Sequence, residues 1–259
     1  MPFLSLPTGD LFYTLAGPDA APVVVLANSL GTDHTMWDAQ VPDLAQRFRV
    51  LRYDARGHGQ SAAPPGPYSV EMLGCDVLAL LDNLGVAQAH FCGISLGGLV
   101  GQWLGINAPE RLIKLVISNT ATKIGTTDGW NARIAQVERE GVGTLADATA
   151  ERWFTPKFRQ AQPETVRRIL DVFRATPPAG YAACCAAVRD ADFWRDVRRI
   201  PVPTYVLAGT HDPVTTVADG EFLETHIPQA HLLPLPTAHL ANVEAAPMFT
   251  GALLRFFLH

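Results

Sequence analysis

Short runs of apolar residues recur along the chain, and stretches with helical or polar patterns separate them. Runs rich in Val and Leu that are apolar at nearly every position are typical of strands buried on both faces of a parallel sheet. Such runs stand at Val23–Ala27, Arg49–Asp54, Ala89–Gly93, Leu112–Ser118, Thr204–Gly209 and His231–Leu235. The opening FLSL-PTGD-LFYTL predicts an antiparallel hairpin around a Pro-Thr-Gly-Asp turn. The pattern therefore predicts an α/β fold with a mainly parallel sheet.

Helical periodicity fills several of the intervals between these strands. Ser69 is placed to cap a helix that Gly85 ends, and another helix begins near Pro247. The first of these helices carries an apolar face formed by Leu73, Val77, Leu80, Leu81 and Leu84.

The alternation of strands and helices stops between about Ile124 and Arg195, where every pattern is helical. The simplest account is a helical insertion between two strands of one sheet. We therefore expect a core domain of residues 1–123 and 196–259, and a helical cap domain of residues 124–195 inserted after the sixth strand.

One short motif predicts a nucleophile. The strand that starts at Ala89 runs into Gly93-Ile94-Ser95-Leu96-Gly97, and a helical pattern follows. A G-x-S-x-G turn between a strand and a helix pushes its serine out at the edge of the sheet, with the amides of the helix N-terminus behind it. We interpret Ser95 as a catalytic nucleophile; the alternative is an ordinary glycine-rich turn.

A serine nucleophile needs a base, and the base needs an acid that orients it. On this kind of fold the chain order is Ser, then Asp or Glu, then His. Asp212 and His239 follow the last two predicted strands, so both should reach the edge that carries Ser95. We assign Asp212 as the orienting acid and His239 as the base, although the acid can also follow the preceding strand, near Asn119.

Acyl transfer also needs two donors for the oxyanion of the tetrahedral intermediate. We expect the backbone amides of Leu96, directly after the nucleophile, and of Leu30, in the loop after the strand Val23–Ala27. A second candidate histidine, His58, lies in the motif RGHGQS, and we interpret it as a loop-packing residue.

Composition excludes several other classes of protein. The chain has 259 residues, 17% of them charged, and a net charge of −5 without a basic stripe, so nucleic acid is not an expected partner.

We identify no signal peptide and no membrane-spanning stretch, and we expect a cytoplasmic protein. The four cysteines form no CxxC pair and have no histidine at zinc spacing, so we predict reduced thiols and no metal site. The oligomeric state stays open.

These motifs together resemble the α/β-hydrolase superfamily, in which GISLG, YDARGHGQS, GTHDPVT and AHLANVEAAP stand at the usual places. The resemblance covers the whole chain and implies an eight-stranded, mostly parallel sheet flanked by helices. At closer range the chain resembles the 3-oxoadipate enol-lactonases of aromatic catabolism, through residues 28–61, 90–125 and 238–249. One departure is Asn28, where many relatives carry a histidine that braces the loop; Asn can also form hydrogen bonds there.

The resemblance implies hydrolysis of an enol-lactone with a carboxylate arm to 3-oxoadipate, in the β-ketoadipate pathway, without a metal or organic cofactor. Other activities of the same fold are the alternatives: a small-ester esterase, a perhydrolase or a carbon–carbon bond hydrolase. A hydrolase-fold receptor that binds a lactone is an alternative of another class.

The substrate that the resemblance implies suggests three residues of the predicted cap. An apolar lactone ring suits aromatic walls such as Trp130 and Trp153, and its carboxylate requires a nearby donor or cation. Arg133 shares a helical face with Trp130 and is our candidate, with Lys123 as the next.

Overall fold

One eight-stranded sheet forms the centre of the protein, with the strand order β1-β2-β4-β3-β5-β6-β7-β8. A computed structural model of the chain describes residues 3–259; Met1 and Pro2, which the predicted core domain includes, lie outside this range. The strands are β1 (Phe3–Leu6), β2 (Gly9–Ala16), β3 (Val23–Ala27), β4 (Arg49–Tyr53), β5 (Ala89–Ile94), β6 (Leu112–Ser118), β7 (Thr204–Gly209) and β8 (Ala230–Leu235).

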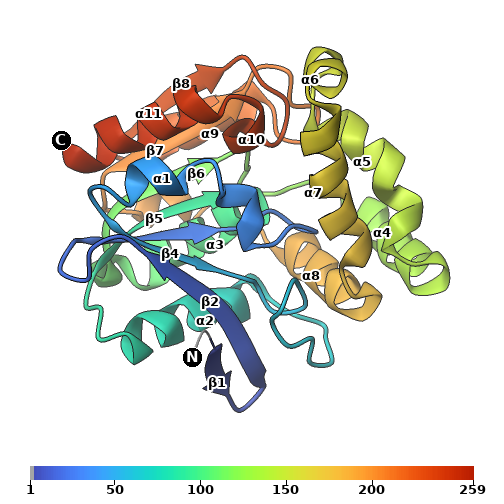
Figure 1. The fold of residues 1–259 in the computed structure, drawn as a ribbon, viewed down its shortest axis with the longest axis horizontal. Coiled ribbons are helices and arrows are strands. Elements are labelled where there is room, and N and C mark those ends of the chain that lie inside the picture. The colour runs from blue at the N-terminus through green and yellow to red at the C-terminus, as the bar shows by residue number, and fades with distance from the viewer. Residues whose placement is uncertain (1–2) are drawn as a thin grey trace.

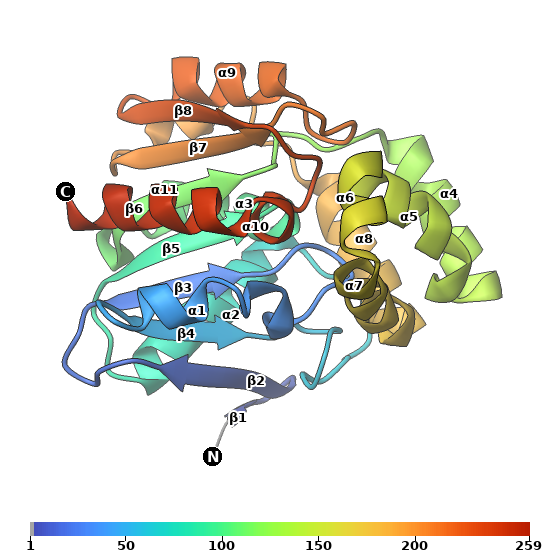
Figure 2. The same ribbon diagram turned by 45° about the horizontal axis from the view of Figure 1, so that its top comes forward.

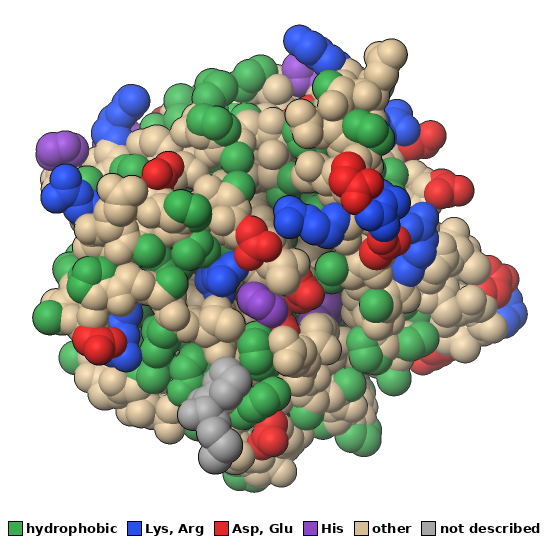
Figure 3. Space-filling model, in the orientation of Figure 1, with side chains coloured by type: hydrophobic (Ala, Val, Ile, Leu, Met, Phe, Trp, Pro, Cys, Tyr) green, Lys and Arg blue, Asp and Glu red, His purple; other side chains and the backbone are tan. Residues whose placement is uncertain are grey.

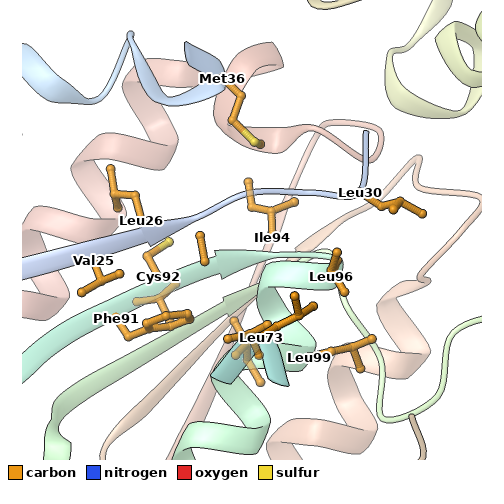
Figure 4. Close-up of a cluster of buried hydrophobic side chains, with 14 of the residues drawn as sticks. Val25, Leu26, Leu30, Met36, Leu73, Phe91, Cys92, Ile94, Leu96 and Leu99 are labelled. Atoms are coloured by element: carbon orange, nitrogen blue, oxygen red, sulfur yellow. The ribbon is translucent and has the colours of Figure 1, made fainter. Parts of the chain in front are cut away.

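The sheet is mostly parallel, as predicted. β1 and β2 form the expected antiparallel hairpin, and β2 also pairs antiparallel with β4. Every pairing from β4 through β3, β5, β6 and β7 to β8 is parallel. All residues of β3 and β5 are buried, which explains their continuous apolar sequences. Figure 4 shows part of the apolar core around these two strands.

Helices cover both faces of the sheet (Figures 1 and 2). One face is covered by α1 (Val41–Leu44) and α11 (Ala246–Leu258), and the other by α2 (Val70–Asn83), α3 (Leu96–Asn107) and α9 (Val217–His226). Ser69 caps α2 as predicted, since its side chain accepts a hydrogen bond from the Met72 amide at 3.1 Å. Short 3-10 helices lie at His34–Trp37, Pro109–Arg111, Val142–Leu145 and Val197–Arg199, and α10 spans Ala241–Glu244.

Residues 124–195, which we call the helical segment, connect β6 to β7. The segment contains α4 (Thr127–Glu140), α5 (Ala146–Trp153), α6 (Pro156–Ala161), α7 (Pro163–Ala175) and α8 (Pro178–Asp190). These helices gather at the end of the sheet where the parallel strands terminate (Figure 2). Ligands of parallel α/β sheets bind at that end, so the helical segment lies over the edge where a site is expected.

The face of the molecule in Figure 3 carries basic and acidic side chains side by side. On the face in Figure 3, basic side chains over α7 are interleaved with acidic ones, and Arg167 pairs with both Glu164 and Asp171. None of the helices within residues 3–259 is both long and apolar enough to cross a bilayer. The four cysteines are unpaired, and Cys184 and Cys185 are buried within α8.

His90, on β5, is a buried histidine with aromatic neighbours. Its ring centroid lies 5.5 Å from that of Phe48 and 4.7 Å from that of Phe257. Its Nδ1 has no hydrogen-bond partner within residues 3–259. Burial, with a smaller effect of Lys114, lowers the pKa of His90 from 6.5 to about 4.

This pKa predicts a dependence of stability on pH. Below pH 6.5 His90 is protonated in the unfolded chain, whereas in the folded chain it stays neutral down to about pH 4. The contribution of His90 to the free energy of unfolding is therefore complete above pH 6.5 and falls as the pH drops, by at most about 1.4 kcal/mol per pH unit. The decline should be shallower for His90→Phe than for the wild type, as measured by urea unfolding between pH 7 and 4. Equal slopes would contradict this explanation.

Candidate active site

Ser95 lies at a sharp turn between β5 and α3. Its backbone has φ 55° and ψ −110°, a conformation that costs a residue with a side chain about 1–3 kcal/mol. Side chains have no room beside it: a Cβ at Gly93 would lie 2.1 Å from the Gly97 carbonyl oxygen, and one at Gly97 would lie 2.4 Å from the Ala27 carbonyl oxygen. The turn that the G-x-S-x-G motif predicts is therefore present.

Three hydrogen bonds from neighbouring strand ends hold this turn. The Ser95 amide donates to the Ser118 carbonyl oxygen at 3.0 Å, and the Thr120 hydroxyl donates to the Ser95 carbonyl oxygen at 3.0 Å. The Gly97 amide donates to the Asn28 carbonyl oxygen at 3.0 Å. The turn is thus bonded to the ends of β6 and β3, and the Ser95 side chain faces a pocket.

Asp212 and His239 come together as the chain order predicts. Asp212 follows β7 and His239 follows β8, and His239 Nδ1 lies 2.7 Å from Asp212 Oδ2. Both residues are buried. An ionised carboxylate only accepts hydrogen bonds, so Nδ1 carries a proton, and in the neutral imidazole this tautomer leaves the lone pair on Nε2. The imidazole therefore presents a basic nitrogen on the side away from Asp212.

The surroundings of Asp212 favour its charged form. Oδ1 accepts hydrogen bonds from the amides of Val214 (2.8 Å) and Thr215 (3.2 Å), and Oδ2 accepts from the Thr215 hydroxyl (2.8 Å) and from Asn119 Nδ2 (3.0 Å). Burial raises the pKa of the Asp212 carboxyl, but the nearby His239 and the hydrogen bonds from Asn119 and the Val214 amide outweigh burial, so the pKa lies below its ordinary value. The carboxylate stays ionised beside the imidazole.

The alternative position for the acid, after β6, is occupied by Asn119. Its amide Nδ2 donates both to Asp212 Oδ2 and, at 3.1 Å, to the Ala238 carbonyl oxygen. An amide cannot act as the acid, and Asn119 instead fixes the Asp212 carboxylate relative to the loop that carries His239. The carboxylate beside His239 is therefore that of Asp212.

Ser95 and His239 line one pocket of about 390 Å³, together with Leu30. Within residues 3–259, Ser95 Oγ forms no hydrogen bond with His239, and such bonds are often long until substrate is bound. Leu30 and Leu96 lie at the edge where β3 and β5 end (Figure 4). Their backbone amides donate no hydrogen bond to another group of the described chain, so both are free for an oxyanion.

His58 braces the loop that carries Leu30, in line with its interpretation as a packing residue. Its Nε2 accepts a hydrogen bond from the Gly31 amide at 2.8 Å, and burial lowers its pKa, which keeps the ring neutral. Asn28 holds the same loop from the other side: Nδ2 donates to the Tyr53 carbonyl oxygen at 2.8 Å, and Oδ1 accepts from Trp37 Nε1 at 3.0 Å. Asn28 thus forms hydrogen bonds that hold the loop, as the sequence analysis expects of an asparagine at this position.

The helical segment forms the opposite wall of the pocket. Trp130, Arg133 and Trp153, the three residues that the sequence analysis selected, all line it. The Arg133 guanidinium lies 5.0 Å from the centre of the Trp130 ring, and its Nη1 lies 3.4 Å from the Tyr181 hydroxyl oxygen. Lys123, the next candidate, is not among the residues that line the pocket and pairs with Asp192 at 3.1 Å, so the structure places it apart from the other candidates.

Arg152 is a pocket residue that the sequence analysis missed. Its Nη2 donates to the Thr149 hydroxyl at 3.0 Å. Burial, and then the charge of Arg133, lower the pKa of Arg152. Neither guanidinium has a carboxylate partner within 4 Å among residues 3–259. The pocket therefore has an uncompensated positive charge, which favours an anionic ligand.

Outside the pocket, Asp33, His34 and Asp54 form a cluster whose ligand atoms lie within 4.8 Å of one another. The cluster is explained by its own contacts. Asp54 Oδ1 accepts hydrogen bonds from the amide and Nδ1 of His34, both at 2.8 Å, and Asp33 caps the turn through the Thr35 amide. We therefore interpret the cluster as structural.

A family model described as the alpha/beta hydrolase fold matches residues 22–246. The chain therefore belongs to the α/β-hydrolase family. It is 45% identical to 3-oxoadipate enol-lactonase 2 of Acinetobacter baylyi, over 93% of this chain and 91% of the relative. It is 43% identical to 3-oxoadipate enol-lactonase 1 of the same organism, over 92% and 90%. The crystal structure of the enol-lactonase from Burkholderia xenovorans is similar with a TM-score of 0.98, at 42% identity and full coverage of both chains. These findings confirm the resemblance that the motifs indicate.

The contacts of Asp212 generate a prediction for Asp212→Asn. An amide at this position can hold the imidazole in the wrong tautomer, and a change of this kind in a serine protease, a known example, lowers kcat about 10⁴-fold. We expect a loss of ester hydrolysis of that order, measured by steady-state kinetics. Asp219→Asn, in the capping box of α9, is the matched control and should keep near-normal activity. Near-normal activity of Asp212→Asn would exclude Asp212 as the orienting acid.

Proposed function

We propose that this chain opens 3-oxoadipate enol-lactone to 3-oxoadipate, as a serine hydrolase of the β-ketoadipate pathway. One observation carries the proposal: the pocket that joins Ser95 to His239 also contains two arginines without carboxylate partners. Ser95 and His239 suit attack on an ester carbonyl, and the two arginines suit a substrate with a carboxylate. The named relatives at 43% and 45% identity support the same substrate.

In the acylation step, Ser95 Oγ attacks the lactone carbonyl carbon while His239 Nε2 accepts the hydroxyl proton. The amides of Leu30 and Leu96 donate hydrogen bonds to the oxyanion that forms. The ring C–O bond then breaks, which leaves an ester of Ser95 and an enolate, and His239 returns the proton to the leaving group. An enolate is a better leaving group than an ordinary alkoxide, so protonation by the His239 imidazolium alone is sufficient for this step.

In the deacylation step, water replaces the serine. His239 accepts a proton from a water molecule, whose oxygen attacks the acyl carbon, and the proton then returns to Ser95 Oγ. The enol product converts to the ketone. In both steps the Asp212 carboxylate stabilises the imidazolium that forms when His239 accepts a proton.

The helical segment acts in this proposal as a cap that selects the substrate. Trp130 and Trp153 offer flat apolar surfaces to the lactone ring, and the guanidiniums of Arg133 and Arg152 receive its carboxylate. Burial lowers the pKa of Arg152 most, and the charge of Arg133 lowers it further, because the two cations repel each other. A bound carboxylate relieves that repulsion, and a neutral substrate does not.

The nucleophile is tested with Ser95→Ala. Loss of a triad nucleophile costs on the order of 10⁴-fold or more in kcat, because the remaining groups cannot form the acyl intermediate. We expect the variant to fold normally and to lose turnover of the enol-lactone, followed by the decrease in its ultraviolet absorbance. Wild-type rates from a preparation free of contaminating esterase would refute the role of Ser95.

The carboxylate contact is tested with Arg133→Met and Arg152→Met. A charged hydrogen bond contributes about 1.5–3 kcal/mol, so each variant should lose about ten-fold or more in kcat/KM for the enol-lactone. For a neutral lactone that lacks the carboxylate, kcat/KM should hardly change. Arg168→Met, an exposed arginine of the same helical segment, is the matched control. Equal losses of kcat/KM on both substrates would mean that the arginines only stabilise the helical segment and do not bind the carboxylate.

A further inference from the structure

The loop that carries His239 is hydrogen-bonded to the helical segment. The Leu240 amide donates to the Trp153 carbonyl oxygen at 3.1 Å. The hydroxyl of Thr155 donates to Glu244 Oε1, and the Thr155 amide donates to Glu244 Oε2 at 3.3 Å. Trp153 and Thr155 lie where α5 ends and α6 begins. The helical segment therefore contacts the loop that carries His239, which we call the histidine loop, at the junction between α5 and α6.

Glu244 also holds the histidine loop itself. Its Oε2 accepts a hydrogen bond from the Ala238 amide at 2.9 Å. The residues on both sides of His239 are thus fixed, Ala238 by the Glu244 carboxylate and Leu240 by the Trp153 carbonyl oxygen. We call these contacts of Trp153, Thr155 and Glu244 with the loop 238–240 the clasp.

The clasp is continuous with the wall of the pocket. The Trp153 ring lines the pocket and packs edge-to-face on Phe173, with centroids 5.4 Å apart. Phe173 in turn packs on Tyr181 at 5.6 Å, and Tyr181 is the residue that contacts Arg133. A ligand that touches the Trp153 ring therefore touches the residue whose carbonyl oxygen positions the histidine loop.

We propose that Glu244 is a positioning residue that couples the helical segment to His239, so that the segment sets the alignment of the base with Ser95. This inference rests on the roles proposed above for Ser95 and His239. The general base must lie within hydrogen-bond distance of the serine hydroxyl, and Ser95 and His239 line the same pocket, so the position of the loop 238–240 sets that distance. A displacement of the loop by about 1 Å can cost about 10²-fold in rate.

A carboxylate suits this position better than an amide. Three donors converge on Glu244: two backbone amides and one hydroxyl. The two oxygens of an ionised carboxylate accept all three hydrogen bonds, whereas the NH₂ group of a glutamine would face a donor. Glu244→Gln therefore keeps the shape of the side chain and breaks one side of the clasp.

The experiment compares Glu244→Gln with Thr155→Val. The second variant removes the hydroxyl contact to Glu244 and the cap of α6 at the Phe158 amide, and it keeps the Thr155 amide contact and the histidine loop. The substrate is p-nitrophenyl acetate, a small neutral ester that does not need the arginines, and the enol-lactone is assayed in parallel. We expect kcat to fall about ten-fold or more in Glu244→Gln and about three-fold in Thr155→Val, on both substrates. KM should stay within about two-fold, because the change affects the transition state and not binding.

Two further measurements separate positioning from simple support of the fold. The downfield proton NMR signal of His239 Nδ1–H should shift or broaden in both variants. The losses in the double variant should be smaller than the product of the single losses, because both substitutions act through one contact. Thr155→Ser should restore wild-type kcat, and Thr144→Val, whose hydroxyl bonds the Gly141 carbonyl within the segment, should behave as the wild type.

The outcomes are distinct. If both variants keep kcat and the NMR signal of the wild type and lose only thermal stability, the clasp is structural and the proposal is wrong. If Glu244→Gln does not fold, Thr155→Val decides by the same criteria. If Ser95→Ala still hydrolyses p-nitrophenyl acetate, the proposed catalytic roles fail, whatever the clasp variants show. If the wild type hydrolyses this ester but not the enol-lactone, the substrate assignment alone fails.

Discussion

The strained turn at Ser95 is the feature on which the rest of the site depends. A serine at φ 55° persists only where surrounding structure offsets the cost. Here β5 is buried along its whole length, and the turn is hydrogen-bonded to the ends of β3 and β6. The same turn starts α3, which leaves the Leu96 amide unbonded beside the serine. The proposed nucleophile and one of the proposed oxyanion donors thus result from the same backbone constraint.

Charge is distributed unequally between the two sides of the pocket. On the sheet side, the Asp212 carboxylate is surrounded by donors that stabilise its ionised form. On the side of the helical segment, Arg133 and Arg152 have polar neighbours but no counter-ion among residues 3–259. Two guanidiniums without a counter-ion favour binding of an anionic group between them. The two sides of the pocket therefore differ in sign: an acid partners the histidine, and cations line the helical segment.

The helical segment is seated directly on the loops of the sheet. A Cβ at Gly31 would lie 2.6 Å from the Phe173 ring, so glycine next to Leu30 lets the segment approach the expected oxyanion loop. A Cβ at Gly57 would lie 2.7 Å from Gly180 Cα, at the start of α8. Together with the clasp, these contacts place the segment against the loops of Leu30, His58 and His239. Its position and the geometry of the site are thus coupled by packing.

By itself the sequence determined the strands, the turn at Ser95 and the residues brought to one edge of the sheet. The reason is local: continuous apolar runs require a doubly covered parallel sheet, and the carboxyl ends of its strands meet at one edge. Asp212 and His239 could therefore be placed by chain order. The tertiary structure alone decided that Asn119 supports Asp212, that Arg152 faces the pocket and that Lys123 does not. It also decided that Glu244 reaches Thr155, 89 residues away. These contacts depend on how helices of the segment are rotated and docked, and helical periodicity does not encode the docking of one helix on another.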